Sequence, residues 1–156
     1  MPESTPFERV VAHLDDTGVE YRLLHHGPTL TSLDAARERG VDAGSGAKSL
    51  VVKGKDGLVL FVVPGDAQLD WKRVKAAGIR GARLATDDEL LAVTGLTKGS
   101  VPPLGGLFGL PVFLDRDLTE RDLVRFNAGS LTDSAELRGA DLATVTGATV
   151  GEYRRL

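Results

Sequence analysis

Two apolar runs separated by a short polar stretch constrain the fold of this chain more than any other feature of its sequence. The runs cover residues 47–54 (AKSLVVKG) and 58–64 (LVLFVVP), and a Lys-Asp-Gly stretch suited to a tight turn stands between them. This pattern predicts a β-hairpin. Because the second run is apolar on both faces, we expect it near the centre of a sheet.

Helix signals surround this hairpin. Thr5 as a cap, Pro6 at the first helical position and Glu8 three residues after the cap predict a helix over residues 5–17, which Gly18 ends. We expect further helices from Thr31 or Ser32 through Arg39, from Asp66 to about Ala77 with Trp71 and Val74 inward, from Thr86 to Gly95, and after Asp141. Further strands are expected at 19–24, 83–85, 112–114 and about 122–126, with a turn at 26–28 and one more short strand before Asp141.

The order of these elements predicts the fold class. Helices are mixed with adjacent strands instead of alternating strictly with them, which favours an α+β domain with a mixed or antiparallel sheet. An αβ sandwich with a parallel sheet remains open. The length of 156 residues fits one domain, 1–156.

Composition excludes several classes of protein. Without cysteine there is no thiol nucleophile, disulfide or cysteine-ligated metal, and three histidines make a metal enzyme a poor fit. The net charge of −3 argues against a strongly basic nucleic-acid binder, so any polyanion must be met locally. No apolar run reaches the length of a membrane span, and the first residues lack the basic start of a secretory signal. We expect a cytoplasmic protein without a DNA or membrane partner.

Lys48 is the most informative single residue. In a strand it shares a face with Leu50 and Val52, while Ser49 and Val51 take the other face. Its ammonium either reaches water along an apolar surface or projects into a cleft. In a cleft it would supply a positive charge for a phosphate or a developing oxyanion.

Two small-residue segments are candidate ligand loops. The glycines and prolines of 99–109 (GSVPPLGGLFG) are either a plain connection or a stiff loop that presents backbone N–H groups. The turn formed by Asn127, Ala128, Gly129 and Ser130 either caps itself or hydrogen-bonds a carbonyl or ribose hydroxyl.

Charged clusters carry weaker signals. Lys72, Arg73 and Lys75, with Arg80 and Arg83 nearby, form either a solvated helix face or a contact for a phosphate backbone. The acidic pairs at 15–16 and 87–88 fit helix ends. No Gly-x-Ser-x-Gly elbow occurs and His13 falls within the first helix, so covalent serine catalysis is not expected.

An ordered set of short motifs resembles the YbaK/prolyl-tRNA synthetase-associated editing domain family. The motifs span about residues 20–145 and comprise HGP at 26–28, TSLDAA at 31–36, GAKSL at 46–50, PGD at 64–66 with LD at 69–70, RLA at 83–85, GSVPPLG at 99–105, NAG at 127–129 and DL at 141–142. No single motif is specific, but their ordered set is.

The resemblance implies a mostly antiparallel, curved mixed sheet with flanking helices, and an activity that deacylates mischarged aminoacyl-tRNA. The family's functional lysine matches Lys48. Its binding positions match Ser49, Gly99, Ser100, Pro102, Pro103, Gly105, Asn127, Ala128, Gly129 and Asp141. Two departures concern amino-acid specificity: Ser49 stands where Asn or Thr is frequent, and the late pocket histidine of several members is absent.

The mechanism implied needs no metal, cofactor or covalent intermediate. Lys48 would bind the 3′-terminal phosphate or the substrate carbonyl, and backbone N–H groups of residues 99–105 would hold the carbonyl oxygen. The partner would be the acceptor end of mischarged tRNA, with a synthetase as a possible second partner. A non-catalytic module that binds tRNA ends or a synthetase, and a hydrolase of small esters or amides, are the alternatives.

Overall fold

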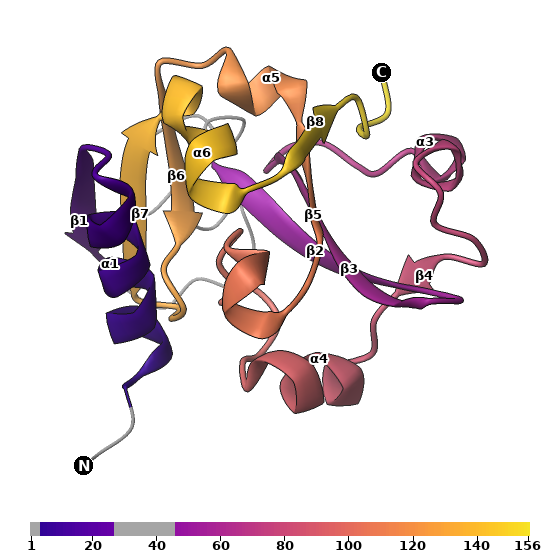
Figure 1. The fold of residues 1–156 in the computed structure, drawn as a ribbon, viewed down its shortest axis with the longest axis horizontal. Coiled ribbons are helices and arrows are strands. Elements are labelled where there is room, and N and C mark those ends of the chain that lie inside the picture. Colours follow the sequence, from indigo (N-terminus) through magenta and orange to yellow (C-terminus); the bar gives the residue numbers. More distant parts are fainter. Residues whose placement is uncertain (1–3, 27–45) are drawn as a thin grey trace.

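The computed structural model describes residues 4–26 and 46–156, and these form a mixed α+β fold (Figure 1). The helices are α1 Pro6–Thr17, α3 Trp71–Ala76, α4 Asp87–Thr94, α5 Arg116–Thr119 and α6 Leu142–Thr146, with single turns η2 Gly105–Phe108 and η3 Gly139–Asp141. The strands are β1 Tyr21–His25, β2 Ala47–Gly54, β3 Gly57–Pro64, β4 Arg83–Leu84, β5 Val112–Asp115, β6 Leu123–Asn127, β7 Asp133–Arg138 and β8 Thr149–Gly151. The helix expected through Arg39, and the turn at 26–28 beyond His26, lie outside the described residues.

The predicted hairpin is confirmed and occupies the middle of a five-stranded sheet. β2 and β3 pair antiparallel from Ala47 opposite Pro64 to Gly54 opposite Gly57, and the sheet order is β4-β2-β3-β5-β8. The β3–β5 and β5–β8 pairs are parallel, while the other pairs are antiparallel. The predicted mixed, mostly antiparallel architecture is therefore confirmed.

A second sheet departs from the single sheet that we expected. It contains three antiparallel strands in the order β1-β7-β6. An isolated parallel bridge between Gly46 and Arg125 joins it to the start of β2. Figure 1 shows this sheet with α1 at one side of the molecule and α3 with β4 at the other.

Side chains on the two faces of the β2–β3 hairpin enter different hydrophobic clusters. Val51, Leu60 and Val62 belong to the larger cluster, which also contains side chains from α1, α4, α6 and the three-stranded sheet. The alternate residues belong to the smaller cluster, whose buried members are Val52, Val59, Phe61, Val63, Leu69, Val74 and Tyr153. The alternation explains why β3 is apolar throughout: both of its faces are buried.

Local signals fix the two longest helices as predicted. The Thr5 hydroxyl accepts a hydrogen bond from Glu8 N, and Gly18 ends α1 in the left-handed conformation. Thr86 and Glu89 form a full capping box on α4, which Gly95 ends in the same way. No helix in the described ranges, 4–26 and 46–156, is long and apolar enough to cross a membrane.

The prediction that Asp66 caps the third helix was wrong. α3 begins at Trp71, and its cap is Asp70, whose carboxylate accepts a hydrogen bond from Lys72 N at 3.0 Å. Preceding residues are held in extended form by the distant C-terminal segment, because Leu69 bridges Arg154 and Asp70 N donates to Tyr153 O. The shorter helix buries Val74 but leaves Trp71 43% exposed, so the expected inward position of Trp71 was also wrong.

Candidate functional site

A cleft of about 550 Å³ lies on the face of β2 that carries Lys48. Its polar lining comes from Lys48, Gln68, Asp70, Lys72 and Arg155. Its apolar lining comes from Leu50, Leu69, Trp71 and Leu84. Such a volume is in the range of sites for small ligands. Three cationic side chains, from β2, α3 and the C-terminal segment, therefore meet around one hollow.

Lys48 projects into this cleft instead of running along an open surface. Its Nζ donates a hydrogen bond to Ala67 O at 2.5 Å, and its side chain is partly buried. Burial lowers the pKa of the Lys48 amine, and the nearby Asp66 carboxylate opposes that shift. One of three ammonium donors is engaged by Ala67, which leaves donors for a ligand.

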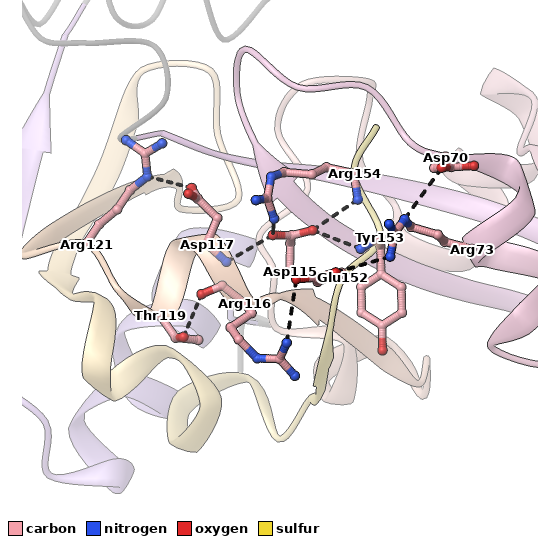
Figure 2. Close-up of polar contacts among 10 residues, drawn as sticks. All are labelled: Asp70, Arg73, Asp115, Arg116, Asp117, Thr119, Arg121, Glu152, Tyr153 and Arg154. Atoms are coloured by element: carbon pink, nitrogen blue, oxygen red, sulfur yellow. Dashed lines mark hydrogen bonds and ion pairs between the residues drawn. The ribbon is translucent and has the colours of Figure 1, made fainter. Parts of the chain in front are cut away.

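The C-terminal wall of the cleft depends on a buried carboxylate. Asp115, at the end of β5, has no solvent exposure and accepts hydrogen bonds from the backbone N–H groups of Asp117, Tyr153 and Arg154. The Arg154 guanidinium also donates to it at 2.5 Å (Figure 2). Arg155 is the next residue. Its backbone N–H donates a hydrogen bond to Gln68 O, and its guanidinium donates one to Gln68 Oε1. Asp115 thereby fixes the chain that supplies Arg155.

The structure divides the expected basic set of α3. Lys72 is exposed and lines the cleft. Arg73 is engaged by carboxylates, at 3.5 Å from Asp70 and 3.2 Å from Glu152 (Figure 2). Lys75 is exposed and is not among the residues that line the cleft. Of the three, Lys72 is the one placed beside Lys48.

The segment 99–105 is packed and anchored, but it does not line the Lys48 cleft. Val101 and Leu104 belong to the larger hydrophobic cluster, on the opposite face of β2 from Lys48. The Ser100 hydroxyl donates to Thr97 O at 2.8 Å, and Pro102 and Pro103 are buried. Residues 99–105 therefore do not line this cleft, and Val101 and Leu104 pack with Val51 on the other face of β2. The expectation that Lys48 and the loop share one pocket stays a prediction.

Gly105 allows a close approach inside this loop. A Cβ at position 105 would lie 2.5 Å from Leu110 O and 2.5 Å from Val112 Cγ2, whereas one at Gly106 would meet nothing within 4 Å. Gly105→Ala is expected to lower the free energy of unfolding by about 1–3 kcal/mol through overpacking. Gly106→Ala is the matched control, and urea denaturation measures both. Equal stabilities of the two variants would contradict the assigned role of Gly105.

The loop lies beside part of the predicted 127–129 turn. The Asn127 side-chain amide donates to Gly99 O, so these two expected site residues are in contact. Ala128 is fully buried and its N–H donates to Asp133 O at 2.9 Å. Gly129 has a φ of 80°, and a Cβ there would approach Pro6 at 3.0 Å. These contacts give the turn a structural function that is independent of any ligand.

Ser49 and Asp141 are the remaining expected site residues. The Ser49 hydroxyl is buried and has no hydrogen-bond partner among the described residues. By strand alternation it lies on the loop's side of β2. Asp141 stands at the start of α6, where its side chain makes no capping hydrogen bond, and it does not line the Lys48 cleft. The described residues place no group of three or more histidine, aspartate or glutamate side chains where a metal could be held.

Sequence reasoning missed Gln68, Trp71, Leu84 and Arg155 as cleft residues. Residues 83–85 were expected to form a strand, but the segment itself does not indicate that this strand pairs with β2, where Leu84 lies opposite Val52. β8 was not predicted, and no local signal connects the C-terminal residues to Gln68. They are brought together by tertiary contacts: Asp115 binds Tyr153 and Arg154, Leu69 bridges Arg154, and Arg155 N donates to Gln68 O.

Fold and cleft together define a small α+β domain with a cationic, aromatic-bearing site suited to an anionic ligand. A model of the aminoacyl-tRNA editing domain family matches residues 26–145. Over 159 aligned residues the chain is 31% identical to the multifunctional Ser/Thr-tRNA deacylase ProXp-y of Escherichia coli (strain K12), covering 97% of this chain and 95% of that protein. It is 30% identical to the proline–tRNA ligase of Thermosipho melanesiensis over 104 residues, which cover 66% of this chain and 18% of the ligase.

A solved structure agrees with these matches. The crystal structure of a candidate trans-editing enzyme for prolyl-tRNA synthetase superimposes with a TM-score of 0.82 at 31% identity, covering 99% of this chain and 100% of the other. The chain belongs to the aminoacyl-tRNA editing domain family. The family and fold predicted from the sequence are thus confirmed, as is the predicted class of enzyme, a hydrolase.

Proposed function

We propose that this protein is a trans-editing aminoacyl-tRNA deacylase, which hydrolyses the ester between a wrongly attached amino acid and the terminal ribose of tRNA. The observation that carries the proposal is the partly buried Lys48 ammonium in a cleft, within a chain that belongs to the editing family. The name of the Escherichia coli relative supports the same reaction class. The proposal treats residues 1–156 as a single editing domain.

The reaction makes modest chemical demands. An aminoacyl ester is already activated, so water can attack its carbonyl carbon without a metal, a cofactor or a covalent intermediate. The negative charge that develops on the carbonyl oxygen must be stabilised by oriented hydrogen-bond donors. The neighbouring ribose hydroxyl of the substrate positions the attacking water.

We assign different parts of the substrate to Lys48 and to residues 99–105, because the loop does not line the Lys48 cleft. Lys48 opens toward the cleft with two further cations, Lys72 and Arg155, so it binds the 3′-terminal phosphate. Backbone N–H groups of the 99–105 loop, on the other side of β2, hold the acyl carbonyl.

Selectivity in this arrangement comes from size. A hydrolytic site that admits small side chains and excludes the larger cognate one corrects errors that the synthetase cannot avoid. The Ser49 hydroxyl, which is buried without a hydrogen-bond partner among the described residues, lies on the same side of β2 as the loop. The name of the Escherichia coli relative makes serine and threonine esters the first substrates to test.

The partner in this proposal is the acceptor end of a mischarged tRNA. A prolyl-tRNA synthetase contains a region similar to this chain, so a synthetase is a reasonable second partner in handing over the tRNA. Such a substrate places the protein in the cytoplasm. The local cations of the cleft are enough for an acceptor end, which explains why a protein of net charge −3 can act on RNA.

The deciding experiment incubates the purified protein with a panel of aminoacyl-tRNAs, beginning with Ser and Thr on non-cognate tRNA. We expect loss of at least one mischarged ester well above its spontaneous rate, with correctly charged tRNA left intact. Binding of tRNA without hydrolysis of any ester would instead indicate a non-catalytic module. Equal rates on aminoacyl esters that lack tRNA would indicate a small-ester hydrolase.

A further inference from the structure

We propose that the Lys48 cleft holds the unpaired nucleotides at the 3′ end of tRNA, with one base stacked on Trp71 and the phosphates held by Lys72 and Arg155. The inference rests on the proposed function and adds to it. It assigns a binding role to Trp71 and Arg155, which neither the sequence nor the family match pointed out.

Trp71 has the placement of a stacking platform. It is the first residue of α3, it lines the cleft, and 43% of it is exposed although it is the largest apolar side chain in the protein. Leu50 and Leu84 border the same hollow. An exposed indole beside aliphatic side chains offers a flat apolar surface to a base, and stacking of this kind accepts any base.

The cations around Trp71 are available to a ligand. In the part of the chain that the structure describes, Lys72 and Arg155 have no ion-pair partner, while Arg73 is held by Asp70 and Glu152. The Arg155 guanidinium contacts the neutral Gln68 amide oxygen at 3.1 Å. The carboxylate of Asp70 is already occupied by Lys72 N and Arg73. The cleft therefore presents net positive charge.

The shape and chemistry favour a short single strand over other polyanions. A hollow of about 550 Å³ accommodates one or two nucleotides but not a duplex. A basic groove with an aromatic side chain is how proteins hold single-stranded nucleic acid. An acidic peptide would use the cations but would leave the Trp71 indole without a flat partner.

Trp71 is the only tryptophan of the chain, so its fluorescence reports directly on this cleft. The probe is an uncharged RNA minihelix with the unpaired 3′ end of tRNA, compared with the same minihelix lacking those nucleotides. We expect quenching by the first and little response to the second. A response that is identical for both, or absent for both, would overturn the inference.

Variants separate stacking from charge. Trp71→Ala should weaken binding of the intact minihelix about tenfold, as for one stacked base, and Trp71→Phe should restore part of the affinity. Leu91→Ala is the control, because Leu91 is 53% exposed on α4 and lies outside the cleft. Lys72→Ala should reduce the slope of log affinity against log salt by about 0.7. Lys55→Ala, which removes an exposed lysine at the hairpin turn, should leave that slope unchanged.

Failure of the inference can be distinguished from failure of the proposed function. If mischarged tRNA is hydrolysed and Trp71→Ala leaves its KM unchanged, the inference is wrong while the deacylase proposal stands. If the minihelix quenches Trp71 but no ester is hydrolysed, the inference stands and the deacylase proposal is wrong. Circular dichroism of each variant checks that the fold is retained.

Discussion

Replacing Lys48 with alanine is expected to lower kcat/KM for mischarged tRNA by at least about a hundredfold, the loss typical when one partner of a hydrogen-bonded charge pair is removed from a binding site. The ammonium is held in place by Ala67 O and faces the cleft. Its removal leaves the ligand without its central positive charge. The fold should survive, since Lys48 is only partly buried and stands near the start of β2.

The controls for this variant follow from the strand itself. Lys48→Met keeps the apolar stem beside Leu50 but removes the charge, so it should behave like the alanine variant if charge is what matters. Lys53→Ala removes a lysine at the other end of β2, where it forms an exposed ion pair with Glu89 at 3.0 Å, and should leave activity near the original value. Near-normal kcat/KM in Lys48→Met would overturn the role of this residue.

The split between KM and kcat identifies which substrate group Lys48 binds. A phosphate is bound equally in the ground state and the transition state, so its loss raises KM more than it lowers kcat. Contact with the carbonyl oxygen would instead lower kcat. Our assignment of Lys48 to the 3′-terminal phosphate predicts the first pattern.

The pH dependence checks the same assignment. Because burial lowers the pKa of the Lys48 amine, the cation is lost at a lower pH than for an ordinary lysine. Activity above the spontaneous hydrolysis of the ester should therefore fall as pH rises through that lowered pKa. The fall should be absent from the residual activity of Lys48→Met.

The second large effect is expected for Asp115→Ala, which should destabilise the fold by about 3–5 kcal/mol. The variant leaves three backbone N–H groups and the Arg154 guanidinium without their shared acceptor in a site with no solvent exposure. In a protein of this size such a loss lowers Tm by roughly 10 °C. Urea and thermal denaturation measure the two quantities.

A neighbouring carboxylate gives the matched control. Asp117 forms a partly exposed ion pair at 2.8 Å with Arg121, four residues further along the chain (Figure 2), so Asp117→Ala should cost no more than about 1 kcal/mol. A loss from Asp115→Ala no larger than this would show that Asp115 does not hold the C-terminal segment. The affinity of Asp115→Ala for the minihelix should also fall, because the wall carrying Arg155 loosens.

Local sequence signals predicted the elements that depend on neighbouring residues. The two apolar runs gave the β2–β3 hairpin, and the Thr86–Glu89 capping box with Gly95 gave α4. Lys48 could be placed on its strand and on the correct face of β2, because side-chain alternation is a local property. The family was readable from the order of short motifs and was confirmed by the match over residues 26–145.

Prediction failed where distant segments decide the conformation. Asp66 was expected to begin the third helix, but the pairing of Leu69 with Arg154 accompanies extended residues before Trp71, and Asp70 caps the helix. Trp71 was expected inside, yet the shorter helix leaves it at the rim of the cleft. The sequence did not distinguish Arg73 from the other basic residues of α3, whereas the structure pairs Arg73 with the distant Glu152.

The amino-acid sequence by itself determined the central hairpin, the mixed α+β class, the family and the position of Lys48, since each follows from period, capping or motif order within short stretches. The tertiary structure alone decided that Lys48 shares a cleft with Trp71 and Arg155 and not with residues 99–105. The lining of this cleft depends on the order of strands in the sheet and on the buried Asp115 carboxylate, which ties the C-terminal segment to β5. Contacts between residues so far apart in the chain leave no local pattern in the sequence.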